Sequence, residues 1–512
     1  EALLLVGTNI TEANPITGLK ATEAVKKNGA ALITVEALQP AVGTISNIAN
    51  LSAHHFGAHP DRFQALVLGL IKAVVEEGLV APPLTQRAPA FVKATGDAVK
   101  ALAWPVIEQQ TGTTSASLKD AARAFAKTAK AVILVGQGVL RQPGGSGLMT
   151  TLLDLLVLTG HHGLAGCGVA PLAEENNDQG AIEMGAVTEY LPGPAELGDP
   201  AARQRLAQLW KEEVPQTPGR TLLEMLDEAR TGTIKAMFIV GENPAGSLPP
   251  SAKANEALGK LDLLVCQELF LTETAALAHV VLPACSYAEK DGTFTNTEGH
   301  VQPVRHAIEP LGESRPDWEI LSALSVLMGA PLEYGDAKEI TNEIRSLLPG
   351  HGLLGAGPKP PRPDDAVVSR YLQQGYADDL GERYRLTASG LGARGSGQEE
   401  TFTLLMQQSL FHSGKYSTRA KGLLQIQSTG ALAVHSTDAG RLGLTDGSRV
   451  RLSTQQGQVT TTVKLLDRIP EGLAVFPEHF DQDLRRLLSV TADPQTGVPY
   501  YKTAKVKIER VT

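Results

Sequence analysis

Short, continuous apolar runs alternate with amphipathic segments over the first part of the chain. Runs at 2–7, 30–36 and 131–136 are almost free of polar residues, a pattern typical of strands buried on both faces of a sheet. Residues 16–29 have the composition of a helix, preceded by Asn14-Pro15 as N-cap and first helical residue and closed by Gly29. Strands that alternate with helices predict a parallel sheet covered by helices on both faces.

Two further helices are predicted in this first region. Residues 61–78 form a largely apolar helix that ends at Gly78. Ser117 and Asp120 have the spacing of a capping box in front of a helix over 118–130, which leads directly into the apolar run at 131–136. These elements extend the α/β pattern up to about residue 172.

The alternation resumes after a loop-rich stretch. We expect strands at 236–241, 262–268 and 279–283, with helices at 251–261, 272–278 and 317–329 between and after them. Residues 347–365 are rich in Gly and Pro and are expected to form a linker. The sequence therefore predicts a second α/β unit.

From about Thr401 the pattern becomes that of short strands. We expect them at 422–427, 431–436, 449–466 and 472–477, with Gln456-Gly457 turning a hairpin. A small β-rich, barrel-like domain is predicted.

Composition narrows the class of protein. At 512 residues the chain is too long for one core, since domains usually have about 100–200 residues. A net charge of −9 without basic runs argues against a nucleic-acid partner. The longest apolar stretch is interrupted by Lys72, so we expect no membrane span. The first residue is Glu1 and the apolar run starts at once, which leads us to expect a piece of a longer polypeptide.

Potential ligand-binding side chains are few. The three cysteines, Cys167, Cys266 and Cys285, form no C-x-x-C pair, so this segment cannot hold an iron–sulfur cluster alone, and we expect a reducing compartment. The twelve histidines lack the spacing of a metal site and are interpreted as solvated or structural. The residues themselves thus indicate no metal site.

Three strand ends resemble one another: "LLLVGTN" at 3–9, "VILVGQG" at 132–138 and "MFIVGEN" at 237–243. Ligands of open parallel sheets bind outside the carboxyl ends of the strands, where glycine lets the backbone approach closely. Amides and carboxylates at these ends can bond a base or a ribose. A nucleotide-binding surface is one interpretation. The alternative is that these glycines only close ordinary turns, because neither a G-x-G-x-x-G nor a Walker A string occurs.

Longer strings carry a resemblance to a known family. "EENNDQGAIEMGAVTEYLPG", "QELFLTETAALAHVVLPACSYAEKDGTFTNTEGHVQPV", "HSTDAGRLGLTDGSRVRLSTQQGQV" and "DPQTGVPYYKTAKV" occur in this order. Together they resemble the molybdopterin oxidoreductase superfamily over essentially the whole chain. Within it, the sequence is similar to the large iron–sulfur (G-type) subunit of bacterial NADH–quinone oxidoreductase (complex I) and to the catalytic subunit of formate dehydrogenases.

The resemblance implies a fold and its division. It implies two doubly wound, Rossmann-like α/β domains at 1–172 and 173–330. A helical, Gly- and Pro-rich connector at 331–400 would follow, and then a C-terminal double-psi β-barrel at 401–512.

The resemblance also implies a cofactor, molybdopterin guanine dinucleotide, bound or lost by descent. The residues expected to contact it are Gly7, Asn9, Glu36, Gly136, Gln137, Gly138, Asn176, Gln179, Gly180, Gly241, Glu242, Asn243, Gln267, Thr272, Thr274, His412 and Gly414. No catalytic residue and no metal ligand are assigned within the chain, since the family's metal-ligating residue and iron–sulfur domain precede the point where this sequence begins. Iron–sulfur clusters are expected upstream or in partner subunits.

Several positions depart from the family pattern. Active formate dehydrogenases have an arginine where Ala173 stands, and Glu174-Glu175 replace small and amide residues after it. The usual Asp-Pro-Arg after the second strand is Glu36-Ala37-Leu38, and His300 replaces a common arginine. Loss of cations weakens the binding of an anionic substrate.

Three functions stay open. The favoured one is the large subunit of an NADH-linked electron-transfer complex, with a pterin-type body that lacks catalytic activity. It would have iron–sulfur and NADH- or flavin-binding partner subunits, in the cytoplasm or at the inner face of the membrane. The alternatives are an active molybdenum or tungsten enzyme such as a formate dehydrogenase, and a nucleotide-binding structural module.

Overall fold

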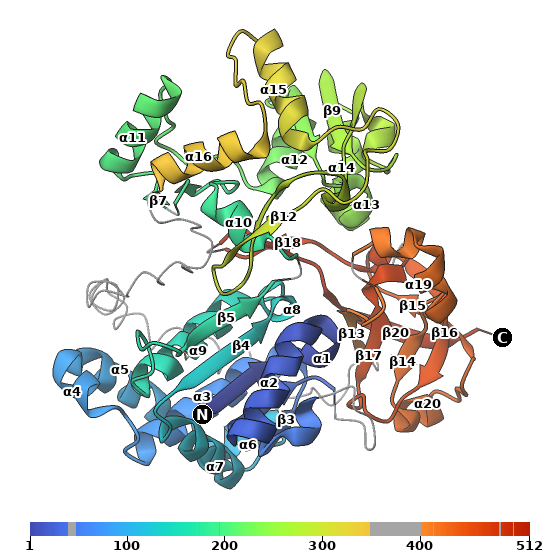
Figure 1. Cartoon of the computed structure of the whole chain (residues 1–512). Coiled ribbons are helices and arrows are strands. Elements are labelled where there is room, and N and C mark those ends of the chain that lie inside the picture. Colours follow the sequence, from blue (N-terminus) through green and yellow to red (C-terminus); the bar gives the residue numbers. More distant parts are fainter. Residues whose placement is uncertain are drawn as a thin grey trace. The chain divides into compact units, whose positions relative to one another are not determined.

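The chain folds into two compact units (Figure 1). One comprises Glu1–Leu172 together with Arg362–Thr512, and the other comprises Ala173–Pro361. The computed structural model describes residues 1–38, 48–173, 175–193, 195–348, 384, 401–412, 414–480, 483–494 and 496–511. The expected linker at 347–365 and the residue Glu174 therefore lie mostly or wholly outside the described residues.

A five-stranded parallel sheet organises the first part of the first unit. Its order is β3-β2-β1-β4-β5, and every neighbouring pair is parallel. The strands are β1 (Ala2–Val6), β2 (Ala31–Glu36), β3 (His54–Gly57), β4 (Ala131–Gly136) and β5 (Gly168–Leu172). The predicted parallel sheet is confirmed, and β1 lies at its centre.

Helices cover both faces of this sheet, as predicted. On one face lie α1 (Ile10–Ala13) and α2 (Pro15–Asn28), and on the other α3 (Phe63–Glu76), α5 (Pro89–Lys100), α6 (Trp104–Thr111), α7 (Ser115–Ala126) and α9 (Gly145–Leu158). Between β3 and β4 the chain also forms α4 (Pro82–Arg87).

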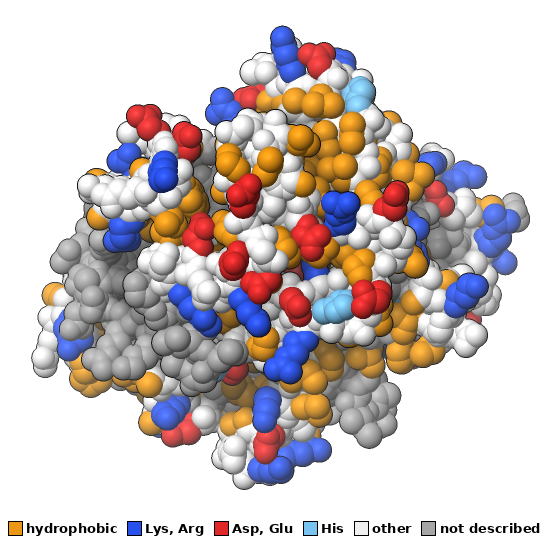
Figure 2. Space-filling view, turned by 45° about the horizontal axis from the view of Figure 1, so that its top comes forward, with side chains coloured by type: hydrophobic (Ala, Val, Ile, Leu, Met, Phe, Trp, Pro, Cys, Tyr) orange, Lys and Arg blue, Asp and Glu red, His pale blue; other side chains and the backbone are white. Residues whose placement is uncertain are grey.

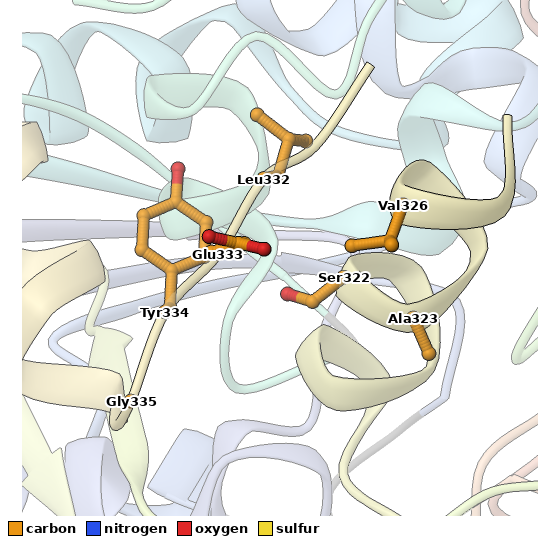
Figure 3. A pocket seen from close by; sticks show the side chains of 7 residues that line it. All are labelled: Ser322, Ala323, Val326, Leu332, Glu333, Tyr334 and Gly335. Atoms are coloured by element: carbon orange, nitrogen blue, oxygen red, sulfur yellow. The ribbon is translucent and has the colours of Figure 1, made fainter. Parts of the chain in front are cut away.

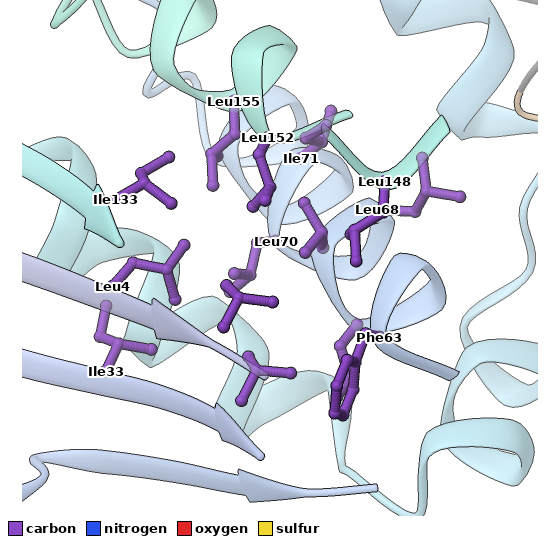
Figure 4. Close-up of a cluster of buried hydrophobic side chains, with 14 of the residues drawn as sticks. Leu4, Ile33, Phe63, Leu68, Leu70, Ile71, Ile133, Leu148, Leu152 and Leu155 are labelled. Carbon is purple, nitrogen blue, oxygen red and sulfur yellow. The ribbon is translucent and has the colours of Figure 1, made fainter. Parts of the chain in front are cut away.

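Alternation along the strands divides the core between the two faces. Leu4, Ile33 and Ile133 pack with α3 and α9 in the larger cluster (Figure 4), while Leu5 and Leu134 join the smaller one under α1 and α2. A parallel strand buried on both sides needs apolar residues at consecutive positions, which is why these segments read as continuous apolar runs.

The helix ends test the capping predictions. Gly29 closes α2 in the left-handed conformation (φ +68°), and Gly78 (φ +65°) follows the end of α3, so both predicted stops are confirmed. The capping box at Ser117 is wrong. The cap of α7 is Thr114, whose hydroxyl accepts a hydrogen bond from the backbone N–H of Ser117 at 3.2 Å. Ser117 therefore already lies in the first helical turn.

The C-terminal part of the first unit is a closed barrel of order β13-β17-β14-β16-β15-β20. Its strands are β13 (Phe402–Gln407), β14 (Leu432–Val434), β15 (Arg449–Ser453), β16 (Gln458–Leu465), β17 (Leu473–Pro477) and β20 (Thr503–Arg510), with α20 (Ser436–Arg441) between β14 and β15. The hairpin predicted at Gln456-Gly457 joins β15 and β16. The predicted fold class, α/β with a C-terminal barrel, is confirmed.

One predicted strand of the barrel is wrong. Residues 422–427 belong largely to the helix α19 (Lys421–Ile426), none of whose residues is buried. The apolar residues Leu423, Leu424 and Ile426 do not alternate with period two, so a strand would not place them on one face. The carbonyl of Ala420 instead accepts hydrogen bonds from the N–H groups of Leu423 and Leu424.

Sheet and barrel share a core within the first unit. Ile469, Leu473 and Val475 belong to the cluster that packs against β1, β2 and β4. Polar contacts reinforce this packing, because Ser146 on α9 donates to Asp493 at 2.7 Å and a ring nitrogen of His59 lies 3.1 Å from the carbonyl oxygen of Glu471.

The second unit has a smaller parallel sheet of order β10-β9-β8. Its strands are β8 (Ala236–Val240), β9 (Leu263–Glu268) and β10 (Val280–Pro283), as predicted, and a hairpin of β11 (Gly292–Thr295) and β12 (Val301–Val304) follows. The unit also contains α10 (Asp178–Glu183), α11 (Pro200–Trp210), α12 (Leu222–Thr231), α13 (Pro244–Ser247), α14 (Ala254–Leu258), α15 (Asp317–Leu327) and α16 (Ala337–Leu347).

Two helices of this unit are shorter than predicted. The segment 251–261 forms α14 over five residues only, after a 3-10 turn at Pro250–Ala252, because Lys253 adopts a left-handed conformation (φ +53°) between them. The segment 272–278 forms only a 3-10 turn at Ala275–Leu277.

Two features of the structure can be compared with the composition, namely the charge of the surface and the apolar content of the helices. On the face drawn in Figure 2, acidic and basic side chains are interspersed. Within the part of the chain that the structure describes, no helix combines the length and apolar content needed to cross a bilayer.

A close approach between two strand ends yields a prediction. A Cβ atom on Gly136 would lie 2.5 Å from the carbonyl oxygen of Gly7 and 2.8 Å from the Cβ of Thr8. We expect Gly136→Ala to destabilise the first unit by about 1–3 kcal/mol, because the backbone of β1 must move. Gly138→Ala is the control, since nothing lies within 4 Å of its Cβ position. Thermal unfolding checks this, and equal midpoints for the two variants would contradict it.

Glu76 on α3 yields a pH-dependent prediction. Burial by itself would raise the pKa of Glu76. Hydrogen bonds from Lys72 and Trp104 and the charges of Lys72 and Lys119 nevertheless hold that pKa below its ordinary value of 4.5. A carboxyl pKa lowered by folding stabilises the fold above the ordinary pKa and loses this effect as the pH falls through the folded pKa.

We therefore expect Glu76→Gln to lower the thermal midpoint most at neutral pH, with the difference from the wild type shrinking below pH 4.5. Glu23→Gln, on an exposed helix face, is the control and should change little, because exposed ion pairs contribute little. A Glu76→Gln difference that grows on acidification would contradict the assignment.

Candidate functional site

The carboxyl edge of the five-stranded sheet gathers six of the predicted site residues. Val6 of β1 pairs with Val35 of β2 and Val135 of β4, so these three strands end side by side. The residues at or just after these ends are Gly7, Asn9, Glu36, Gly136, Gln137 and Gly138. The structure thus brings together six predicted site residues that come from three separate segments of the sequence.

Backbone geometry explains the two glycines at this edge. Gly7 has a φ of +65°, and its N–H donates to the carbonyl of Val35 at 2.7 Å. A side chain on Gly7 would collide with Val139, 1.8 Å from the Cβ position. Gly7 and Gly136 are therefore required by the turn and by close packing, whether or not a ligand binds.

The polar residues of this edge have local partners as well. Asn9 precedes α1, and its Oδ1 accepts from the Thr11 hydroxyl at 2.6 Å. Gln137 and Gly138 form the start of α8 (Gln137–Leu140), and the Glu36 carboxylate is buried at the end of β2. Contacts of these residues with a cofactor stay a prediction.

In the second unit, the turn after β8 is fixed by Asn243. Its Oδ1 accepts hydrogen bonds from the N–H groups of Gly246 and Thr274 and from the Thr274 hydroxyl, at 2.9–3.2 Å. Its Nδ2 donates to Glu273 at 2.8 Å. The amide that the sequence suggested for a base or ribose therefore ties two loops together.

The other residues of this cluster support the same junction. Gly241 donates its N–H to the carbonyl of Gln267 at 2.9 Å, and Glu242 accepts from the Ser247 hydroxyl at 3.1 Å. The hydroxyl of Thr274 accepts from the N–H of Ala245, and that of Thr272 from the N–H of Ala275. The predicted residues Gly241, Glu242, Asn243, Gln267, Thr272 and Thr274 thus form one cluster at the carboxyl ends of β8 and β9.

Two buried acceptors at the end of β9 lack hydrogen-bond partners among the described residues. Gln267 is fully buried, and its Nε2 donates to Asp317 at 2.7 Å while its Oε1 has no donor. Glu268 accepts from the N–H of Leu269 through Oε1, but its buried Oε2 has no donor. Buried polar atoms are usually paired, so unpaired ones mark a place where a ligand or a water can donate.

Sequence reasoning missed three residues beside this cluster. Lys290 donates to Asp317, which in turn holds Gln267, and Glu268 supplies the second unpaired acceptor. All three lie within or beside the sequence strings that carry the family resemblance. Their spacing gave no sign that Asp317 contacts Lys290, 27 residues away, or Gln267, 50 residues away.

The segment 173–180 lies elsewhere in the second unit. Gln179 on α10 donates to Glu183 at 3.0 Å, and Gly180 is buried against Asn177, whose Oδ1 would lie 2.2 Å from a Cβ. Asn176 is exposed and Ala173 is half-buried. Asn177 accepts from the N–H of Thr295 at 2.8 Å, which attaches this segment to the β11–β12 hairpin.

In the barrel, His412 is buried. Its ring nitrogens lie 2.9 Å from the carbonyl of Gln427 and 3.2 Å from the hydroxyl of Ser417. His479, which sequence reasoning missed, lies beside it with ring centroids 5.6 Å apart.

His479 connects the predicted residue Gly414 to this pair. Its Nδ1 lies 3.0 Å from the carbonyl of Gly414, and its Nε2 accepts from the N–H of Ser409 at 3.1 Å. Burial lowers the pKa of His479, which favours the neutral ring that this pattern needs. The ring nitrogens of both histidines have local partners, so the pair braces the loop at 409–417.

No candidate metal centre was found in the described ranges, because no group of three or more His, Cys, Asp or Glu side chains converges there. The cysteines are free, and burial raises the pKa of Cys266 to about 11, so its thiol stays protonated at neutral pH. From the sequence, Cys167 and Cys285 are interpreted as buried; Cys285 is buried, as is Cys266, whereas Cys167 is half-buried.

A wide hollow of about 370 Å³ lies between α15 and residues 332–335 (Figure 3). It contains none of the predicted site residues. Its Tyr334 donates to Glu343 at 2.7 Å, and burial, with that carboxylate, raises the pKa of Tyr334 to about 12.

Comparison with solved structures identifies the fold. The structure of acetylene hydratase from Pelobacter acetylenicus matches with a TM-score of 0.72 at 17% identity, covering 100% of this chain and 78% of that one. At this identity the likeness concerns the fold alone.

Curated relatives extend along the whole sequence. The F420-dependent formate dehydrogenase subunit alpha of Methanocaldococcus jannaschii is 29% identical over 529 residues, covering 100% of this chain and 76% of the relative. The NADPH-Fe(3+) oxidoreductase subunit alpha of Geobacter sulfurreducens is 29% identical over 482 residues, and formate dehydrogenase H of Escherichia coli is 29% identical over 350 residues. The matches span 53% and 48% of these two proteins.

The site residues can be tested against a pterin guanine dinucleotide. A guanine edge and ribose hydroxyls supply hydrogen-bond donors, and Gln267 and Glu268 present buried acceptors without donors. In the first unit, the spaces beside Gly7 and Gly136 are filled by Val139 and by the Gly7 carbonyl, so these glycines serve the turn itself. On the unpaired acceptors of Gln267 and Glu268, the residues of the second unit fit the group.

The family match covers both units. Residues 1–326 match the molybdopterin oxidoreductase family, and residues 405–505 match the molybdopterin dinucleotide binding domain. With the sheet, the barrel and these matches in agreement, the chain belongs to the molybdopterin oxidoreductase family.

Proposed function

We propose that this chain is the cofactor-binding body of a molybdenum or tungsten oxidoreductase subunit, with formate as the substrate. The observation that carries the proposal is the similarity to a formate dehydrogenase subunit alpha over 100% of the chain. The relatives named as alpha subunits support partner subunits for this chain too, and we propose iron–sulfur and NADH- or flavin-binding proteins for that role.

The chain's own residues would bind and orient two pterin guanine dinucleotides. Gln267 and Glu268 would accept hydrogen bonds from the nucleotide at the end of β9, held in place by Asp317 and by the Asn243 cluster. The other nucleotide would lie at the carboxyl edge of the first sheet, beside the predicted contacts Asn9, Gln137 and Gly138. When bound, the cofactor supplies a metal, held by two dithiolenes, that exchanges two electrons with the substrate.

A specific observation favours a second candidate, a body without catalytic activity like that of the large iron–sulfur subunit of complex I. Ala173 occupies the place of an arginine that active formate dehydrogenases carry, and Glu175 adds an exposed negative charge nearby. An anionic substrate would lack a stabilising cation there. In this candidate the same clusters would serve as scaffold and partner surface.

Metal content separates the two candidates. We expect the purified native complex to contain molybdenum or tungsten in stoichiometric amount and to release guanine nucleotide on acid hydrolysis, because the acceptors at Gln267 and Glu268 need donors. Elemental analysis by mass spectrometry checks this. Little metal together with no guanine would overturn the proposal and support the non-catalytic candidate.

Formate turnover tests the substrate. We expect the wild-type complex to reduce a dye acceptor with formate unaided. Ala173→Arg should lower the KM for formate by about tenfold, since a charge-assisted hydrogen bond to a carboxylate is among the stronger polar contacts. Ala173→Gln, with a neutral side chain, is the control. A metal-loaded complex that oxidises no formate in either form would rule out formate as the substrate.

A further inference from the structure

A cavity of about 100 Å³ lies inside the second unit, between α10, the β11–β12 hairpin and α16. These three elements are far apart in the sequence, and the hydrogen bond from the Thr295 N–H to Asn177 joins the first two. The residues that line the cavity are Asn177, Gly180, Met184, Thr293, Thr295, Val301, Pro303, Thr341, Ile344 and Arg345.

One part of the lining is apolar. Met184, Val301, Pro303 and Ile344 contribute only hydrocarbon or thioether groups. Such a wall binds a short hydrocarbon chain better than water, because ordered water needs polar partners.

The polar part of the lining consists of groups that can donate hydrogen bonds, and no carboxylate lines the cavity. Asn177 uses its Oδ1 to accept from Thr295, which leaves its Nδ2 without an acceptor among the described residues. The hydroxyls of Thr293 and Thr295 likewise have no hydrogen-bond partner in the described part of the chain. These groups can donate to an anion, but hydroxyls and amides also accept, so the preference for an anion comes from the charged residue of the lining.

Arg345 supplies the positive charge. It lies on α16, where its neighbours three and four residues away are Asn342, Thr341 and Leu348, so no acid is placed for a helical ion pair. Within the described ranges no carboxylate pairs with Arg345. Its side chain is exposed, so the guanidinium is hydrated when no ligand is bound.

We propose that this cavity binds a small organic carboxylate of about two to four carbons, judged from its volume. Arg345 pairs with the carboxylate, Asn177 and the two threonines donate to it, and the apolar wall takes the hydrocarbon tail. A planar guanidinium matches a carboxylate in a bidentate pair. Phosphate is disfavoured, because its remaining charged oxygens would face the apolar wall without donors. Gly180, one of the residues predicted to contact the cofactor, also lines this cavity, whereas Arg345 and the two threonines are not among those residues.

Isothermal titration calorimetry of the full chain with sodium acetate, propionate, butyrate and octanoate tests the proposal. Affinity should rise by about fourfold for each added methylene up to butyrate, from the burial of apolar surface. Octanoate should bind more weakly than butyrate, because its tail exceeds the cavity. Butylamine and sodium chloride should give no saturable heat.

Two arginine variants complete the test. Arg345→Gln should weaken butyrate binding by about tenfold or more, since it removes a charge-assisted pair. Arg205→Gln, an exposed arginine on α11 that does not line the cavity, should leave the affinity unchanged. Thr295→Val should weaken binding severalfold.

Butyrate that binds no better than chloride, or with equal affinity to the wild type and to Arg345→Gln, would overturn the proposal. Because the readout is binding, a complex without metal or formate turnover would leave this result unaffected.

Discussion

The parallel register of β1 between β2 and β4 is the constraint on which the first unit depends. It aligns Val6 with Val35 and Val135, so three strands from separate parts of the chain end at one edge. The same register divides Leu4 and Leu5 between two cores on opposite faces. Close contact between the strand ends of β1 and β4 then requires glycine at both Gly7 and Gly136.

In the second unit, the polar groups at the ends of β8 and β9 differ in whether their hydrogen-bonding atoms already have partners. Asn243 looks like a ligand contact in the sequence, yet its oxygen accepts three hydrogen bonds from the two loops that it joins. The groups that still need donors are Gln267 Oε1 and Glu268 Oε2, which lie deeper and are held by the neighbouring network. Asn243 thus holds the two loops in place, while the acceptors that lack donors stand on the neighbouring strand β9.

The two proposed functions differ in whether an anionic substrate is bound, so the side chain at position 173 bears on both. The chain has the fold of its family, and its residue 173 is the neutral Ala173, two residues before the exposed Glu175. Similarity along the whole chain to a formate dehydrogenase subunit supports the first proposal, and the lack of a cation at Ala173 supports the second. Arg345, on α16 of the same unit, lines a cavity together with Asn177.

Local sequence by itself determined the strands and their class, because runs such as 131–136 are apolar at consecutive positions, as a parallel strand covered on both faces requires. It failed where a neighbour decides, since Thr114 displaced Ser117 as the cap of α7. It also gathered the strand-end residues of the site but not the partners that hold them. Only the tertiary structure decided contacts such as Gln267 with Asp317, across 50 residues. The pattern of apolar residues within a strand or a helix does not predict such a contact. The contact depends on how the strand and the helix pack against each other.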